Sequence, residues 1–180
     1  AVIGRLLRGI DRNAYCLISR QNYNPNIFDG DGSTRLSGHY YYLPPEFRIG
    51  RLGRYRLFSV NSWLQILQRA RQIARIVKKE GSEAIIACTG DLYDLPAGFL
   101  ASLRAGVQFY PYLFDDYTYQ WVVPMERSFA RCVEPIVIKI ANGVIVPNEF
   151  LRDEYCSRYG VEPALIPNPC EEAEPGPESQ

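Results

Sequence analysis

The chain has little of several residue types on which protein chemistry often depends. Its 180 residues include a single histidine, His39, and its only lysines are Lys78, Lys79 and Lys139. His39 has no partner at metal-ligand or catalytic-triad spacing, so we interpret it as structural. No HExxH, GxSxG or P-loop motif occurs, which leaves no sign of a zinc peptidase, a serine hydrolase or a P-loop nucleotidase. The formal net charge is zero and gives no indication of nucleic-acid binding.

Long apolar runs and paired cysteines are also missing. No run approaches the roughly 18 apolar residues of a membrane-spanning helix, and the sequence has no signal peptide and no N-glycosylation sequon. The five cysteines are an odd number without a CxxC pair. Because Cys16, Cys88 and Cys132 fall in apolar segments, we predict reduced, buried thiols and a cytoplasmic protein.

The residues that are present predict one globular α/β domain over residues 1–170, followed by a linker or frayed tail over 171–180. Hydrophobic residues make up 47% of the chain and charged residues 22%. Short apolar runs alternate with helical patterns, which favours a Rossmann-like parallel sheet flanked by helices. The predicted strands are Tyr15–Ser19, His39–Leu43, Ala84–Cys88, Val107–Phe114, Val144–Pro147 and Ala164–Pro167. The predicted helices are Ala1–Ile10, Ser62–Lys79, Leu95–Ala105, Pro124–Ala141 and Glu149–Tyr159.

Several of these elements carry specific expectations about burial and boundaries. The helix over 62–79 has one apolar stripe, formed by Trp63, Ile66, Leu67, Ala70, Ile73, Ala74 and Val77. The basic residues Arg69, Arg71, Arg75, Lys78 and Lys79 are predicted to lie off that stripe. The run Ala84–Cys88 is continuously apolar, as expected for a strand covered on both faces. Pro135 predicts a kink or break, whereas Asn148 and Gly160 predict the start and stop of the last helix.

Small or polar residues follow four of the predicted strands. In an open parallel sheet, ligands bind at the carboxyl ends of the strands. The four segments there are Thr89-Gly90-Asp91, Asp115-Asp116-Tyr117, Pro147-Asn148-Glu149 and Pro167-Asn168-Pro169. These segments therefore supply the candidate ligand-binding residues.

The adjacent acids Asp115 and Asp116 are the sharpest chemical feature. Two neighbouring carboxylates repel, and one of them could accept a proton from a hydroxyl group or orient that group. The alternative is a pair of acids that starts a helix, where the helix dipole favours them. Asp91 is open to the same two interpretations.

Two further clusters have a functional and a structural interpretation each. Tyr40, Tyr41 and Tyr42 could line a sugar-binding cleft or fill the core. Four arginines, Arg48, Arg51, Arg54 and Arg56, could contact anionic lipid headgroups or an anionic acceptor, or could form a solvated loop. The segment DGDGS over Asp29–Ser33 is interpreted as a turn rather than a calcium loop, because the sixth-position glycine and the closing acid are missing.

The stretch Ala84–Cys170 resembles the N-terminal domain of retaining GT-B glycosyltransferases of the group 1 type (family 4). The resemblance rests on ERSFARCVEPIVIKIANGVIV and on the following VPNEFLRDEYCSRYGVEPALIPNPC, which ends like the strand before the interdomain hinge. It implies transfer of a sugar, with retention, from a UDP- or GDP-sugar donor to an acceptor. It also implies an acceptor-side lobe whose donor-binding C-terminal lobe is missing, so that this piece would be inactive alone and would tend to self-associate.

The resemblance has three departures. The glycine-rich loop after the family's first strand is absent, the paired-glutamate motif of the second lobe is absent, and Asp115-Asp116 replaces the usual His-Asp. We predict Asp115 and Asp116 as catalytic residues and no metal site. The predicted acceptor-binding residues are Thr89, Gly90, Asp91, Tyr112, Tyr117, Asn148 and Glu149. The alternatives are a non-catalytic Rossmann-like binding module and an inverting GT-B enzyme.

Overall fold

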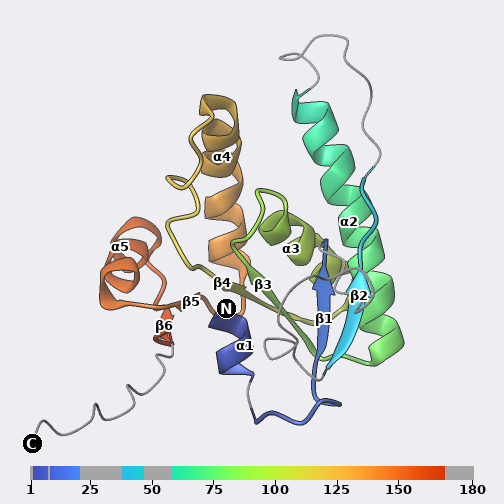
Figure 1. Cartoon of the computed structure of the whole chain (residues 1–180). Helices are drawn as coiled ribbons and strands as arrows, with labels where there is room; N and C mark the ends of the chain where they lie inside the picture. Colours follow the sequence, from blue (N-terminus) through green and yellow to red (C-terminus); the bar gives the residue numbers. More distant parts are fainter. Residues whose placement is uncertain (1, 8, 21–37, 47–57, 169–180) are drawn as a thin grey trace, which may run out of the picture.

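The computed structural model describes residues 2–7, 9–20, 38–46 and 58–168 and has an α/β architecture. Helices and strands alternate along the chain (Figure 1). The strands are β1 (Cys16–Ser19), β2 (His39–Tyr42), β3 (Ala84–Cys88), β4 (Gln108–Tyr112), β5 (Ile145–Val146) and β6 (Ala164–Leu165). The helices are α1 (Val2–Leu6), α2 (Phe58–Glu80), α3 (Asp94–Ala105), α4 (Pro124–Ile140) and α5 (Glu149–Tyr159). The predicted Arg48–Arg56 loop, the DGDGS turn and the tail over 171–180 lie outside the described residues.

All strand pairs in the described part of the chain are parallel, which confirms the predicted fold class. They form a 2-stranded sheet, β1-β2, and a 4-stranded sheet in the order β3-β4-β5-β6. The β3–β4 pairing is the most extensive and runs from Ala84 opposite Gln108 to Cys88 opposite Tyr112. The fold is consistent with a Rossmann-like domain, in which consecutive parallel strands are joined by crossover helices.

Close packing of α3 on the larger sheet forms the centre of the core. Gly98 lies where a side chain would not fit: a Cβ there would be 2.9 Å from the Cβ of Ala87 and 3.1 Å from Cε2 of Phe109. The rings of Phe99 and Phe109 meet edge to face, with centroids 5.8 Å apart. A glycine on α3 therefore lets the helix approach β3 and β4 closely enough to exclude water.

Helix α2 corrects two expectations drawn from its sequence pattern. Its apolar stripe is only partly covered, because Trp63 and Leu67 are 47% and 42% exposed while Ile66 is fully buried. Arg69 is 1% exposed rather than solvated, because three acidic side chains surround it. The helix also begins one turn earlier than predicted, at Phe58.

Two other expectations about burial are wrong, and the predicted break at Pro135 does not occur. Ile86 on β3 is 59% exposed, because no described element covers that face of the strand. Cys132 is exposed, so the predicted set of buried thiols does not hold as a whole. Pro135 lies inside α4 without breaking it, since Val133, Val137 and their neighbours anchor the helix in the core.

Helix α5 confirms the predicted start and stop. The Asn148 side chain accepts a hydrogen bond from the Leu151 backbone N–H at 2.9 Å. Gly160 ends the helix with a φ of 67°, a left-handed conformation that favours glycine. These two boundary residues fix the entry and exit of the chain around α5, beside the carboxyl end of β5.

Candidate polar site at the carboxyl edge of the strands

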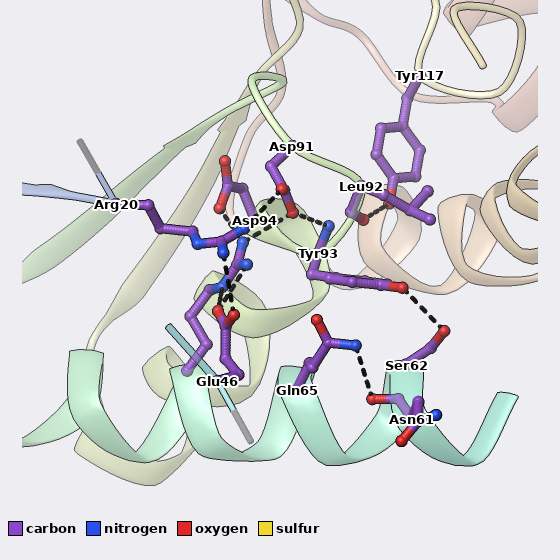
Figure 2. Close-up of polar contacts among 11 residues, drawn as sticks. Arg20, Glu46, Asn61, Ser62, Gln65, Asp91, Leu92, Tyr93, Asp94 and Tyr117 are labelled. Carbon is purple, nitrogen blue, oxygen red and sulfur yellow. Dashed lines mark hydrogen bonds and ion pairs between the residues drawn. The ribbon is translucent and has the colours of Figure 1, made fainter. Parts of the chain in front are cut away.

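Five charged side chains gather just beyond the carboxyl ends of β1, β2 and β3. Arg20 directly follows β1, Glu46 follows β2, and Asp91 and Asp94 follow β3, while Arg69 projects from α2. We call this group the Arg69 cluster. Figure 2 shows the side chains of Glu46, Asp91 and Asp94 close to one another, with the Arg20 side chain reaching them from the left of the view. The cluster therefore links the ends of the two sheets to one helix.

Arg69 is the centre of the cluster. Its Nε donates to Glu46 Oε1 at 2.8 Å, and its Nη1 donates to Asp91 Oδ1 at 2.9 Å and to Asp94 Oδ1 at 2.5 Å. Arg20 completes the ring through Asp91 Oδ2 at 3.2 Å and Glu46 Oε2 at 3.3 Å. Such charge-assisted contacts offset the cost of removing the buried guanidinium from water.

The pKa values of the two aspartates in the cluster are shifted in opposite directions. Burial and the neighbouring Asp91 carboxylate together raise the pKa of Asp94 to about 6, against the opposing effect of Arg69. Burial also raises the pKa of Asp91, but Arg69 and the Tyr93 backbone N–H outweigh this, so that its pKa lies below the usual value. Below about pH 6 this pair therefore holds one proton, on Asp94, while Asp91 stays ionised.

One acceptor atom beside the cluster has no partner among the described residues. Gln65 is 3% exposed, and its Nε2 donates to the Asn61 carbonyl at 3.2 Å, but its Oε1 accepts no hydrogen bond there. Figure 2 shows the Gln65 amide on the side of α2 that faces Tyr93 and Glu46. A buried amide oxygen without a partner is costly, and a hydroxyl or amine donor would satisfy it.

Thr89 joins the segment after β3 to the segment after β4. Its Oγ1 accepts from the Phe114 backbone N–H at 2.9 Å, and its own N–H donates to the Tyr112 carbonyl at 3.2 Å. This places Thr89-Gly90-Asp91 next to the turn that carries Asp115. The structure thus brings together two of the strand ends that the sequence nominates. Gly90 and Asp115 are both exposed.

Asp115 and Asp116 have different surroundings. Asp115 is exposed and bonds to no other described side chain or backbone group. Asp116 uses Oδ1 to accept from the backbone N–H groups of Thr118 and Tyr119, both at 3.0 Å, and pairs Oδ2 with Arg158 at 2.8 Å. Asp116 is therefore a structural anchor of the loop after β4, while Asp115 keeps its carboxylate available.

The Arg158 that holds Asp116 belongs to a second polar cluster, between α4 and α5. Glu134 is 1% exposed and accepts hydrogen bonds from the hydroxyls of Thr118 and Tyr159, each at 2.6 Å, and of Tyr155. Arg158 lies over the Tyr155 ring, 5.4 Å from its centroid. This Glu134 cluster fixes the loop after β4 against α5, and its groups are directed inward.

The other predicted acceptor-binding residues divide into buried and exposed ones. Tyr112 is 3% exposed and donates to the Ile166 carbonyl at 3.2 Å, and Tyr117 is fully buried and donates to the Leu92 carbonyl. Asn148 is exposed, but its side-chain oxygen caps α5; Glu149, in the first turn of that helix, is also exposed. Of these four, only Glu149 presents an exposed side chain without a described internal bond.

The side chain of Tyr41 on β2 bonds away from this edge, whereas Tyr42 is the last residue of β2 and is 46% exposed. Tyr41 donates to Glu80 at the end of α2, where His39 also lies 3.3 Å from the same carboxylate. Lys79 lies over the Tyr41 ring, 5.3 Å from its centroid. Because α2 ends where β3 begins, these contacts are at the amino edge of the strands, and they favour the structural interpretation for Tyr41.

Sequence reasoning missed Arg20, Glu46, Arg69 and Asp94 as site residues. Arg69 could have been found, since it lies three residues after Ile66 and four before Ile73 and so shares the buried side of the helix. A charged residue at a position that the helical period predicts to be buried needs oppositely charged partners. The sequence gives no local sign of which acids those are.

The described residues contain no group of three or more metal-ligating side chains that could hold an ion, and none of the helices described here is long and apolar enough to span a membrane. No model of a known protein family matches the chain, and no curated protein matches it either. The fold and the geometry of the carboxyl edge are therefore the basis for a functional proposal.

Proposed function

We propose that this chain is the acceptor-side lobe of a retaining GT-B glycosyltransferase that uses a UDP- or GDP-sugar. The observation that carries the proposal is the set of accessible acids at the carboxyl edge of a parallel sheet. The side chains of Asp91 and Asp94 are each 34% exposed. Asp115, in the segment that follows the neighbouring strand β4, is exposed as well. Carboxylates at such an edge suit the recognition of sugar hydroxyls.

In this proposal the acids have separate tasks. Asp115 accepts a hydrogen bond from the acceptor hydroxyl and orients it toward the anomeric carbon of the donor. Asp91 and Asp94 accept from neighbouring hydroxyls, and the buried Arg69 keeps their carboxylates in place. A second lobe holds the nucleotide, and the nucleoside diphosphate leaves as the new glycosidic bond forms. We also propose a cytoplasmic location, where nucleotide sugars are available.

The proposal is tested by measuring sugar transfer with the longest natural polypeptide that contains these 180 residues. A panel of UDP- and GDP-sugars is offered with mixed glycoside, glycolipid and water acceptors, and nucleoside diphosphate release is recorded. Release that requires a sugar or lipid acceptor, with a product of retained anomeric configuration, is the expected result. No acceptor-dependent release with any donor, or an inverted product, would overturn the proposal.

A specific observation favours a second candidate, a non-catalytic Rossmann-like binding module. The polar atoms of Thr89, Tyr112, Tyr117 and Asp116 are all used in internal hydrogen bonds, which is more typical of a scaffold than of a reactive site. Such a module would bind a glycoside or other polyol at the Arg69 cluster without turnover. Calorimetric binding without any transfer in the assay above would favour it.

A further inference from the structure

We propose that the exposed face of α2 docks this protein on a membrane surface rich in anionic lipid. At about 100° per residue, the helix places its exposed large apolar residues and three of its four exposed basic residues within one arc of about 120°. This lipid face consists of Val60, Trp63, Leu67, Arg71, Arg75 and Lys78. The inference uses none of the residues of the Arg69 cluster and is independent of the proposed glycosyltransferase activity.

The N-terminal half of the lipid face is apolar and open to solvent. Val60 is 47% exposed, and Trp63 and Leu67 are exposed to a similar extent. An exposed tryptophan beside two aliphatic residues suits the boundary between headgroups and acyl chains, where an amphipathic ring is preferred. Single exposed apolar residues are ordinary, but three on one helix face form a patch that needs a partner.

The start of α4 extends this apolar area. The Phe129 ring meets the Trp63 ring with centroids 6.0 Å apart. Val122 and Val123, directly before α4, are 88% and 49% exposed. Figure 1 shows the N-terminal ends of α2 and α4 projecting at the same end of the molecule. Two helix starts with exposed apolar residues therefore lie at the same end of the molecule, where both can reach one flat surface.

The C-terminal half of the lipid face is basic. Arg71, Arg75 and Lys78 are exposed, and none of them makes an ion pair with another described residue. Helix α2 has no acidic residue before its last position, Glu80, which is engaged by Tyr41 and His39. Among the described residues, no acid therefore competes with anionic phosphates for these three cations.

The order of the two halves defines the docking geometry. If the N-terminal end of α2 tilts toward the surface, Trp63 and its apolar neighbours enter the interface. Arg71, Arg75 and Lys78 then stay at headgroup level, within reach of phosphate groups. A nucleic acid would use the cations but would leave the adjacent apolar patch in water. An anionic bilayer is the partner that satisfies both halves.

The test is flotation of the chain with vesicles of phosphatidylcholine, with or without one third of phosphatidylglycerol. We expect binding to the anionic vesicles alone, weakened by salt. Each cation near the surface contributes about fivefold to the partition coefficient, so the variant Arg71→Gln/Arg75→Gln/Lys78→Gln is expected to bind roughly 100-fold more weakly. The variant Trp63→Ser/Leu67→Ser is also expected to lose binding.

The matched control is Leu103→Ser/Arg104→Gln on α3, which removes an exposed apolar residue and an exposed cation elsewhere. It should bind vesicles as the wild type does, and far-ultraviolet circular dichroism should show all variants folded. Equal binding to neutral and anionic vesicles, or unchanged binding of the triple variant, would overturn the proposal. A preference for single-stranded RNA over vesicles would overturn it too. So would a dimer that Trp63→Ser dissociates in the absence of vesicle binding.

Discussion

Replacing Arg69 by methionine should destabilise the fold strongly. The change keeps a long apolar stem but removes every contact of the guanidinium with Glu46, Asp91 and Asp94. Breaking a buried pair by removing one partner costs about 3–5 kcal/mol, because the remaining charge stays out of water. Here the loss comes mainly from Glu46, whose side chain is 1% exposed, since solvent screens the two aspartates. A domain of this size has about 5–15 kcal/mol in total, so the loss would be a large fraction of its stability.

The assay is urea unfolding at pH 7.5, followed by circular dichroism. Arg71→Met is the control, because Arg71 lies two residues away on the exposed side of α2. This variant should lower the free energy of unfolding by no more than about 0.5 kcal/mol. The double variant Arg69→Met/Glu46→Met should recover a large part of the loss, since the buried Glu46 charge, which Arg69→Met leaves with the partly exposed Arg20 as its partner, is then removed. A loss below about 1 kcal/mol for Arg69→Met, or no recovery in the double variant, would refute the reasoning.

Three further predictions concern packing, protonation and the acidic pair. Gly98→Ala should lower the free energy of unfolding by about 1–3 kcal/mol, because the new Cβ would overlap the facing strand. Gly143→Ala should lower it by less, because a Cβ there would lie 3.4 Å from the nearest atoms, which belong to the Tyr110 ring. Burial raises the pKa of Asp94 to about 6 from 3.8, so between those values the folded protein keeps a proton that the unfolded chain has released. The contribution of this group to stability therefore decreases as the pH rises from about 4 to 6, and Asp94→Asn should flatten that part of the profile. Asp116→Ala should cost about 1–3 kcal/mol through the loss of its three hydrogen bonds, and Asp115→Ala should be nearly neutral; equal effects would contradict the separation of their roles.

The elements that local patterns determine were predictable from the sequence. Ala84–Cys88 and Glu149–Tyr159 have the predicted bounds, because an apolar run and a pair of capping residues are encoded within a few positions. The exposure of Trp63 and Leu67 was not predictable in the same way. A helical period identifies an apolar stripe, but the width of the stripe that neighbours cover depends on tertiary packing.

The candidate site depends on contacts between distant residues, and the sequence predicted it only in part. Asp91 was nominated because it follows a strand, yet its partner Arg69 is 22 residues away and Glu46 is 23 residues from Arg69. The difference between Asp115 and Asp116 depends on Arg158, 42 residues after Asp116. No local pattern distinguishes two adjacent aspartates, so their roles required the structure.

The central claim is that exposed acids at the carboxyl edge bind the acceptor of a sugar-transfer reaction. The most direct measurement compares kcat for sugar transfer in Asp115→Asn with that in Glu83→Gln, an exposed acid at the opposite edge of the sheet. We predict that Asp115→Asn lowers kcat by about 100-fold or more without changing the free energy of unfolding, and that Glu83→Gln leaves both unchanged. Full transfer by Asp115→Asn, or an equal loss in both variants, would contradict the account.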